Sequence, residues 1–165
     1  TGLSMTSLQA DKQILEAFEA ANCILGYKEN RIRMDGRNRK PFKFDATHCP
    51  DLFPALVTFA TLCDGRSDIK GVHRLKHKES DRGLVLQEEF ANIGVIIILD
   101  DDIMHIHGKT SIEGGKVNSH NDHRIAMCFA IAGLFSDDPI EIDGAEAVAK
   151  SYPQFWKHLE KLSLS

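Results

Sequence analysis

The stretch KESDRGLVLQEEFANIGVIIILDDDIMHIH, residues 78–107, decides the class of fold. Its first half carries Leu86, Phe90 and Ile93 at helical spacing, and Gly94 follows as a stop signal. The β-branched run 95–98 then predicts a strand, and residues 103–107 return after three aspartates as its hairpin partner. A helix joined to a hairpin indicates a mixed α/β (α+β) domain.

The residues before this stretch predict similar elements. Residues 11–24 have helical periodicity and precede Gly26, and residues 31–34 alternate as a half-buried strand does. A second helix is expected over residues 52–63, after Pro50, and a short strand over residues 68–72.

The residues after it continue the series. Residues 122–135 are apolar almost all round, which predicts a buried helix. A strand is expected over residues 139–143, and a terminal helix over residues 152–163. No linker interrupts these elements, so residues 1–165 are interpreted as a single partial domain.

An internal repeat appears when each position is compared with the one 72 residues later. The matches include Phe18 with Phe90, Ile24 with Ile96, and Lys78 with Lys150. We therefore predict two strand–helix–strand–helix units, each with a hairpin, over about residues 9–81 and 82–153. Such units cannot bury their apolar faces alone and should stack, with Phe18 and Phe90 buried at equivalent places.

Composition excludes several classes of protein. The 165 residues are 42% apolar and 27% charged, as in globular domains, and the net charge of −4 gives no general field for nucleic acid. No apolar run approaches the roughly 18 residues that span a bilayer. The N-terminus has no secretory pattern and is typical of a chain cut within a longer protein, so we expect a cytoplasmic location without membrane or nucleic-acid partners.

Cofactor and metal motifs are not found in the sequence. The four cysteines form no CxxC pair and are expected to be reduced and buried, and the histidines lack zinc-ligand spacing. No Gly-rich phosphate loop, dinucleotide fingerprint or serine-nucleophile motif occurs. We predict neither a metal nor a cofactor.

Four sites carry polar residues that could do chemistry. Lys78, Glu79 and Arg82 precede or begin a helix, where backbone N–H groups favour anions, although a charge run is usually a solvated surface. His123 and Arg124 begin the apolar helix, where Arg124 either grips an anion or joins a structural ion pair.

The other two sites are weaker candidates for a functional role when each is considered alone. Asp45 precedes a helix and would ordinarily be a cap or turn residue, and Lys150 would ordinarily face solvent. The repeat strengthens the case for Lys150 because this lysine corresponds to Lys78. Several cations with two carboxylates, Asp45 and Glu79, indicate acid–base chemistry on a polyanion.

Four strings carry a resemblance to a known family, in its order and approximate spacing. They are Asp45-x-x-x-x-Pro50-Asp51, Lys78-Glu79-Ser80-Asp81-Arg82, Asp122-His123-Arg124-x-Ala126-Met127 and Ala149-Lys150-x-x-Pro153. The chain resembles the C-terminal portion of EPSP synthase. The resemblance implies the enolpyruvyl transferase fold, an inside-out α/β barrel-like domain of three repeats, of which two are present here. It also implies that the N-terminal domain of the enzyme lies outside this sequence.

The resemblance implies an activity and residue roles. Members of the family move the enolpyruvyl group of phosphoenolpyruvate to the 5-hydroxyl of shikimate 3-phosphate, in the shikimate pathway to chorismate and aromatic amino acids. Asp45 and Glu79 match the proton-transferring carboxylates, and Lys78 matches a substrate-contacting lysine. The cations around phosphoenolpyruvate correspond to Arg82, Arg124 and Lys150, with His123 beside them.

Two alternatives stay open. A UDP-N-acetylglucosamine enolpyruvyl transferase would share the fold and reaction type, although its cysteine loop is not recognisable here. The chain could also be a non-catalytic anion-binding domain. We expect the isolated 165 residues to have no enolpyruvyl transferase activity towards shikimate 3-phosphate.

Overall fold

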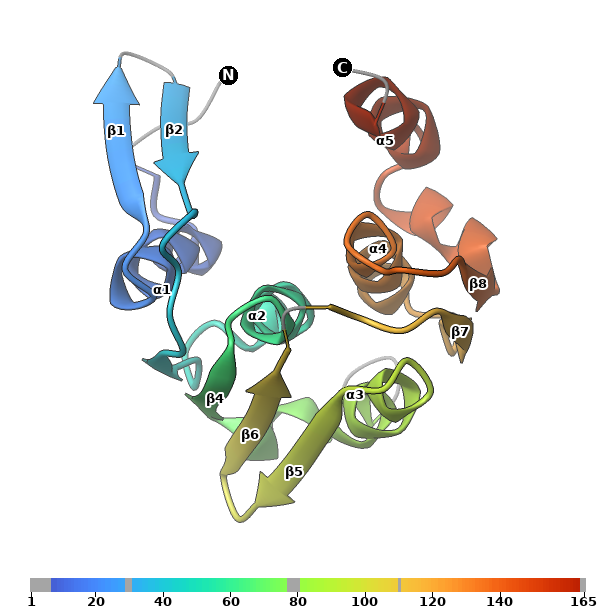
Figure 1. Ribbon diagram of the computed structural model, residues 1–165, viewed down its shortest axis with the longest axis horizontal. Helices are drawn as coiled ribbons and strands as arrows, with labels where there is room; N and C mark the ends of the chain where they lie inside the picture. The colour runs from blue at the N-terminus through green and yellow to red at the C-terminus, as the bar shows by residue number, and fades with distance from the viewer. Residues whose placement is uncertain (1–6, 29–30, 77–80, 110, 164–165) are drawn as a thin grey trace.

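The computed structural model describes residues 7–28, 31–76, 81–109 and 111–163. Its body is built from two adjacent helices, a sheet below them and a third helix beside the sheet, as Figure 1 shows. Two arms rise from this body: a β-hairpin near the N-terminus and the last helix near the C-terminus. A groove lies between these arms, with Met34 of the hairpin and Phe155 of the last helix in its lining.

The first half of the chain begins with a 3₁₀ turn at Ala10–Gln13, and two more 3₁₀ turns lie at Pro50–Leu52 and Val72–Leu75. Its helices and strands are α1 (Ile14–Ala20), β1 (Ile24–Lys28), β2 (Arg31–Asp35), β3 (Lys43–Asp45), α2 (Phe53–Thr61) and β4 (Gly65–Lys70).

The second half follows the same order and adds one helix. Its elements are α3 (Arg82–Ala91), β5 (Ile96–Asp100), β6 (Ile103–Gly108), β7 (Gly115–Asn118), α4 (His123–Ala132), β8 (Ile140–Asp143), a 3₁₀ turn at Ala145–Lys150, and α5 (Phe155–Ser163). The helix expected to begin near Lys78 begins at Arg82, because Asp81 is its N-cap, whose side chain accepts a hydrogen bond from the backbone N–H of Leu84.

Strand pairing follows the 72-residue spacing. In the parallel pair of β3 and β4, Lys43 lies opposite Asp68, and in the pair of β7 and β8, Gly115 lies opposite Ile140. Both partners of the second pair come 72 residues after those of the first. The hairpins β1–β2 and β5–β6 are also spaced in this way, so element order and register recur together.

The middle sheet combines strands from both halves of the chain. Its order is β3-β4-β6-β5, with β4 and β6 antiparallel. The hairpin β1–β2 and the parallel pair β7–β8 are separate two-stranded sheets among the described residues. The hairpin β1–β2 therefore corresponds to the β5–β6 half of the four-stranded sheet, and the pair β7–β8 corresponds to its β3–β4 half.

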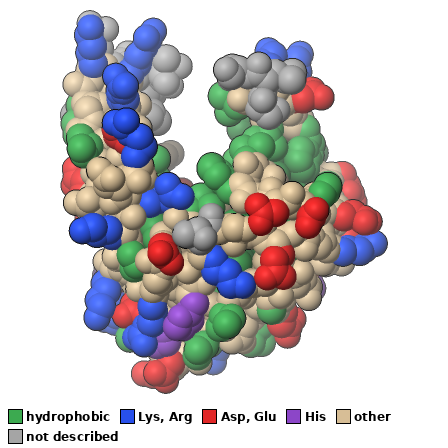
Figure 2. All heavy atoms as spheres, viewed as in Figure 1, with side chains coloured by type: hydrophobic (Ala, Val, Ile, Leu, Met, Phe, Trp, Pro, Cys, Tyr) green, Lys and Arg blue, Asp and Glu red, His purple; other side chains and the backbone are tan. Residues whose placement is uncertain are grey.

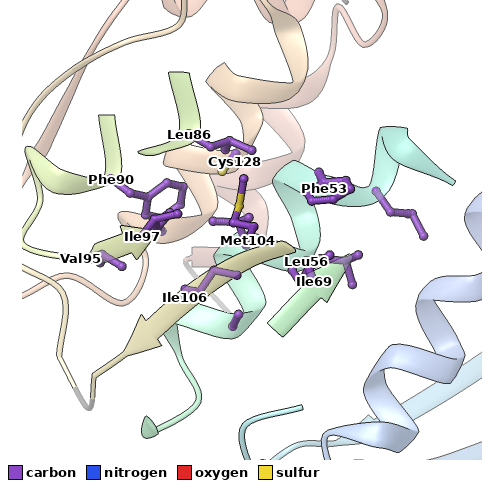
Figure 3. Packing of buried hydrophobic residues seen from close by; sticks show 14 of the residues in the cluster. Phe53, Leu56, Ile69, Leu86, Phe90, Val95, Ile97, Met104, Ile106 and Cys128 are labelled. Atoms are coloured by element: carbon purple, nitrogen blue, oxygen red, sulfur yellow. The ribbon is translucent and has the colours of Figure 1, made fainter. Parts of the chain in front are cut away.

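The core lies where α2, α3 and α4 meet the middle sheet. Figure 3 shows Phe53 and Leu56 of α2 close to Met104 of β6, and Phe90 packs against Phe129 with ring centroids 4.8 Å apart. Phe90 is fully buried, whereas its counterpart Phe18 is half-buried against Phe59. The prediction that both phenylalanines are buried is therefore correct for Phe90 and wrong for Phe18.

All four cysteines are buried free thiols, as expected, and the sequence around Cys23, Cys63 and Cys128 is apolar. Burial raises the pKa of Cys128 to about 12, and its Sγ lies 2.8 Å from the Thr58 hydroxyl between α2 and α4. This thiol is therefore a neutral packing group between the two helices.

Several element boundaries differ from the sequence-based prediction. The first helix ends at Ala20 instead of Ile24, because Asn22 adopts a left-handed φ of 64° and releases the chain into β1, which contains Gly26. The strand predicted over residues 68–72 begins at Gly65 and ends at Lys70, since Gly71 has a φ of 111°. The strands β1, β3 and β7 were not predicted. None of the described helices is long and apolar enough to cross a bilayer.

Candidate functional site

Arg82, the first residue of α3, is completely buried with its guanidinium between two carboxylates. Its Nε and Nη2 donate to Asp122 Oδ2 at 2.9 and 2.8 Å, and its Nη1 donates to Asp51 Oδ1 at 3.1 Å. A buried guanidinium needs such countercharge because desolvation is costly. In this arrangement Arg82 is a structural ion-pair partner whose side chain does not reach solvent.

Asp122 connects the arginine to the start of α4. It is the N-cap of this helix, and its Oδ1 accepts a hydrogen bond from the backbone N–H of Arg124 at 2.8 Å. The carboxylate is itself fully buried. One side chain thus begins α4 and holds Arg82 of the preceding helix.

Asp51 joins the two arginines from the opposite side. Its Oδ1 accepts from Arg82, and its Oδ2 lies 3.4 Å from Arg124 Nη2. Arg124 Nη1 also donates to the backbone oxygen of Asp51 at 3.2 Å. We call Arg82, Arg124, Asp51 and Asp122 the arginine cluster. Arg124 is its cation with solvent access, since its side chain is 32% exposed.

The loop before α4 brings Lys150 to the same region. Lys150 Nζ donates to the carbonyl of Asn121 at 2.6 Å, next to Asp122. His120 and Asn121 have left-handed φ values of 50° and 58°, and Glu89 Oε1 lies 2.7 Å from His120 Nε2. The structure therefore brings Lys150, Arg82 and Arg124 to one region around the start of α4.

His123 lies beside these cations, whereas Asp45 lies apart from them. His123 is the half-buried first residue of α4, beside Arg124. Asp45 ends β3 and faces a separate hollow with Asp68 and Ile103, where its ion pair is to Lys70 at 3.3 Å. The described contacts of Asp45 are thus to its own sheet, and none of them joins it to the arginine cluster.

The Asp45 carboxylate is ionised in this arrangement. Hydrogen bonding from Thr47, whose backbone N–H donates to Asp45 Oδ1 at 3.0 Å, lowers the pKa of Asp45 to about 2, and Lys70 contributes. A carboxylate with this pKa is a weak base near neutral pH. Lys78 and Glu79 lie outside the described residues, so their predicted places stay predictions.

An apolar groove of about 480 Å³ opens beside the cluster. Figure 2 shows the hollow between the β1–β2 arm and the α5 arm, with hydrophobic side chains along the α5 side. Asp51 and Arg124 form part of its lining. The apolar lining comes from α1, β2, α2, the α4 segment and α5: Ile14, Phe18, Met34, Pro54, Ala55, Phe59, Leu62, Met127, Cys128, Ile131, Phe135 and Phe155.

Sequence reasoning assigned no role to Asp51, Asp122 or Asn121. The N-cap pattern before an apolar helix is a signal for Asp122, but no sequence pattern pairs Asp51 with arginines 31 and 73 residues away. In the part of the chain that the structure describes, no group of three or more His, Cys, Asp or Glu side chains is placed to hold a metal ion.

Comparison with known proteins gives the family. Residues 1–159 match the family model of EPSP synthase (3-phosphoshikimate 1-carboxyvinyltransferase). The chain is 38% identical over 161 residues to the 3-phosphoshikimate 1-carboxyvinyltransferase of Clostridium kluyveri, covering 98% of this chain and 38% of that protein. The enzyme of the same name from Brachyspira hyodysenteriae is 39% identical over 152 residues, covering 91% of this chain and 36% of that protein.

A solved structure agrees in fold. The EPSP synthase of Acinetobacter baumannii superposes with a TM-score of 0.78 at 28% identity, covering 99% of this chain and 40% of that one. The chain therefore spans about 38% of the length of the curated relatives that it matches. It belongs to the EPSP synthase family, with the α/β fold of the enolpyruvyl transferases.

Proposed function

We propose that the complete protein transfers the enolpyruvyl group of phosphoenolpyruvate to the 5-hydroxyl of shikimate 3-phosphate, releasing phosphate. The observation that carries this proposal is the convergence of Arg124, Lys150 and the arginine cluster at the start of α4. Phosphoenolpyruvate has a carboxylate and a phosphate close together, and cations at a helix N-terminus suit such an anion. The reaction belongs to the shikimate pathway, and a cytoplasmic location stays a prediction.

The roles of the individual side chains are those that the resemblance to the family implies. Arg124 and Lys150, with His123 beside them, would bind the anion, and Lys78 would contact substrate. Arg82 supports Arg124 through Asp51 in the present arrangement. Asp45 would accept the proton of the attacking hydroxyl, and Glu79 would move a proton at the methylene carbon. For Asp45, the substrate and the missing domain would have to change its surroundings, because its pKa here is about 2.

We further propose that these residues are two repeats, about 9–81 and 82–153, of a three-repeat domain. The middle sheet joins the β3–β4 pair of one repeat to the β5–β6 hairpin of the next. By the same rule, β8 would receive a hairpin and β2 would pair with another strand, both supplied by chain outside this sequence. The relatives, of which this chain covers about 38%, have the length for this repeat and for the N-terminal domain.

The groove supports the same proposal. Ala55 and Phe59 of α2 line it, and so do Met127 and Ile131 of α4, which come 72 residues later in the chain. Equivalent faces of the two helices thus meet one apolar space. A third equivalent helix would fill this space and bury side chains such as Phe59 and Ile131.

A phosphate-release assay on the complete protein tests the activity. We expect release only when phosphoenolpyruvate and shikimate 3-phosphate are both present, and its loss in Asp45→Ala and Glu79→Gln variants that remain folded. UDP-N-acetylglucosamine, offered as the acceptor instead, should give no release. Turnover with that sugar nucleotide would support the alternative transferase, and phosphoenolpyruvate binding without turnover would support an anion-binding domain.

A further inference from the structure

We infer that Asp51 is a positioning residue, whose carboxylate bridges Arg82 and Arg124 and fixes the Arg124 guanidinium at the end of the groove. The inference rests on the proposed function, because it assigns Arg124 the anion. Asp51 lies in the 3₁₀ turn that precedes α2, whereas both arginines begin helices of the second repeat. It therefore links the two repeats at the place where the cations converge.

The geometry gives each carboxylate oxygen its own arginine. Asp51 Oδ1 is 3.1 Å from Arg82 Nη1, and Oδ2 is 3.4 Å from Arg124 Nη2. The backbone oxygen of Asp51 accepts from Arg124 Nη1 at 3.2 Å, so the residue holds both terminal nitrogens of Arg124. A guanidinium has five N–H donors, and those that do not face Asp51 remain for a ligand.

Electrostatics explains why a carboxylate is needed at this position. Two guanidinium groups repel each other, and Arg82 cannot turn away because its side chain is fully buried against Asp122. A carboxylate between them offsets the repulsion and keeps Arg124 in one orientation. Bidentate binding of a substrate carboxylate depends on that orientation, and an orientation fixed beforehand costs less entropy on binding.

Asp51 also has a second effect on anion binding, and this effect is unfavourable. The negative charge of Asp51 weakens the attraction of the site for an anion. Asp51→Asn removes the charge and presents an amide N–H to one of the arginines, so it separates the two effects. Loss of positioning weakens phosphoenolpyruvate binding, whereas loss of charge alone would strengthen it.

The test measures steady-state kinetics of the complete protein with Asp51→Asn, Asp51→Glu and the control Asp64→Asn. Asp64 is an exposed carboxylate beyond the other end of α2. In Asp51→Asn we expect the KM for phosphoenolpyruvate to rise about tenfold, the usual effect of losing a charged hydrogen bond, while the KM for shikimate 3-phosphate stays within about twofold. Asp51→Glu, which keeps the charge, should show a smaller rise, and the control should show none.

A KM for phosphoenolpyruvate that is unchanged or lower in folded Asp51→Asn overturns the inference, and so does an equal rise for both substrates. If Asp51→Asn does not fold, Asp51→Glu decides the question, since an unchanged KM there also overturns it. A crystal structure of the complete Asp51→Asn protein, or of Asp51→Glu in that case, is independent of activity. In that crystal structure, the Arg124 side chain should no longer have its fixed orientation. An unmoved Arg124 contradicts the inference, even if the wild-type protein proves to have no transferase activity.

Discussion

Arg82 belongs to the string Lys78–Arg82 that resembles the family, and its side chain is buried as part of the structure. Its side chain has no exposed surface, and its described partners are Asp122 and Asp51. The sequence indicated a cation at a helix start, which is correct, but it gave no sign that two distant carboxylates enclose it. Sequence spacing does not reveal these contacts, because they depend on how α3, α4 and the turn before α2 pack.

Removing the charge of Asp122 should destabilise the protein strongly. Asp122→Asn keeps an acceptable N-cap for α4 but leaves the buried Arg82 with less countercharge. We expect a loss of about 3 kcal/mol in the free energy of unfolding, measured by urea denaturation of the complete protein. The matched control is Asp64→Asn, which changes an exposed carboxylate. Equal stability of the two variants would contradict the structural role of the Arg82–Asp122 pair.

Asp68 should contribute to stability in acid. Hydrogen bonding from Arg66 first, and then from His105, lowers its pKa to about 2. A lowered carboxylate pKa adds stability that is present above the unfolded-state pKa of about 4 and is lost as the pH falls through the folded-state value. Solvent screening at this sheet surface reduces the contribution to about 1 kcal/mol.

Urea denaturation at pH 5 and pH 2.5 measures this effect. The wild-type protein should lose about 0.7 kcal/mol more than Asp68→Asn over that interval, because pH 2.5 is still above the folded-state pKa of about 2 and because the variant has no charge to lose. Identical pH dependence in the two proteins would show that the pKa of Asp68 does not differ between folded and unfolded states.

At the scale of elements, the long periodic segments were predictable, whereas the short strands β3 and β7 were not. The α4 segment was expected to be buried from its apolar residues alone, and Ile125 and Phe129 are fully buried. The strands β3 and β7 have only three and four residues, too few for an alternating pattern to show. They are defined by parallel pairing with β4 and β8, which depends on contacts distant in sequence.

Close backbone approach between β6 and α2 gives a test of this packing. A Cβ added at Gly108 would lie 2.0 Å from the carbonyl oxygen of Cys63 and 2.4 Å from that of Ala60. Gly108→Ala should therefore cost about 3 kcal/mol of stability. Gly133→Ala is the matched control, since its Cβ would have no contact closer than 3.4 Å and the residue has helical φ.

Thermal unfolding of the two glycine variants distinguishes the sites. Gly133→Ala should be neutral or stabilising by about 0.5 kcal/mol, because alanine restricts the unfolded chain. A Gly108→Ala protein as stable as Gly133→Ala would show that β6 does not approach the end of α2 as described.

At the scale of the whole molecule, the sequence predicted the two repeated units. It did not predict which of their strands and helix faces have no partner within this chain. The matched residues 72 positions apart indicated two units, and strand register follows this spacing. That β1–β2 and β7–β8 would be two-stranded, and that the helices would line an apolar groove, depends on which neighbours each unit has. The neighbours proposed above would lie outside the sequence, so its own pattern contains no signal for them.

The central claim is that this chain supplies part of a transferase site that other parts of the protein complete. Its most direct test is reconstitution: phosphate release from phosphoenolpyruvate and shikimate 3-phosphate is measured for the 165-residue chain, for the rest of the protein, and for their mixture. We expect no release from either part alone, because the other domain is needed to position the second substrate and exclude water. Release should appear on mixing and be absent when the added chain carries Asp45→Ala. Turnover by the lone chain that disappears with Asp45→Ala would contradict the claim.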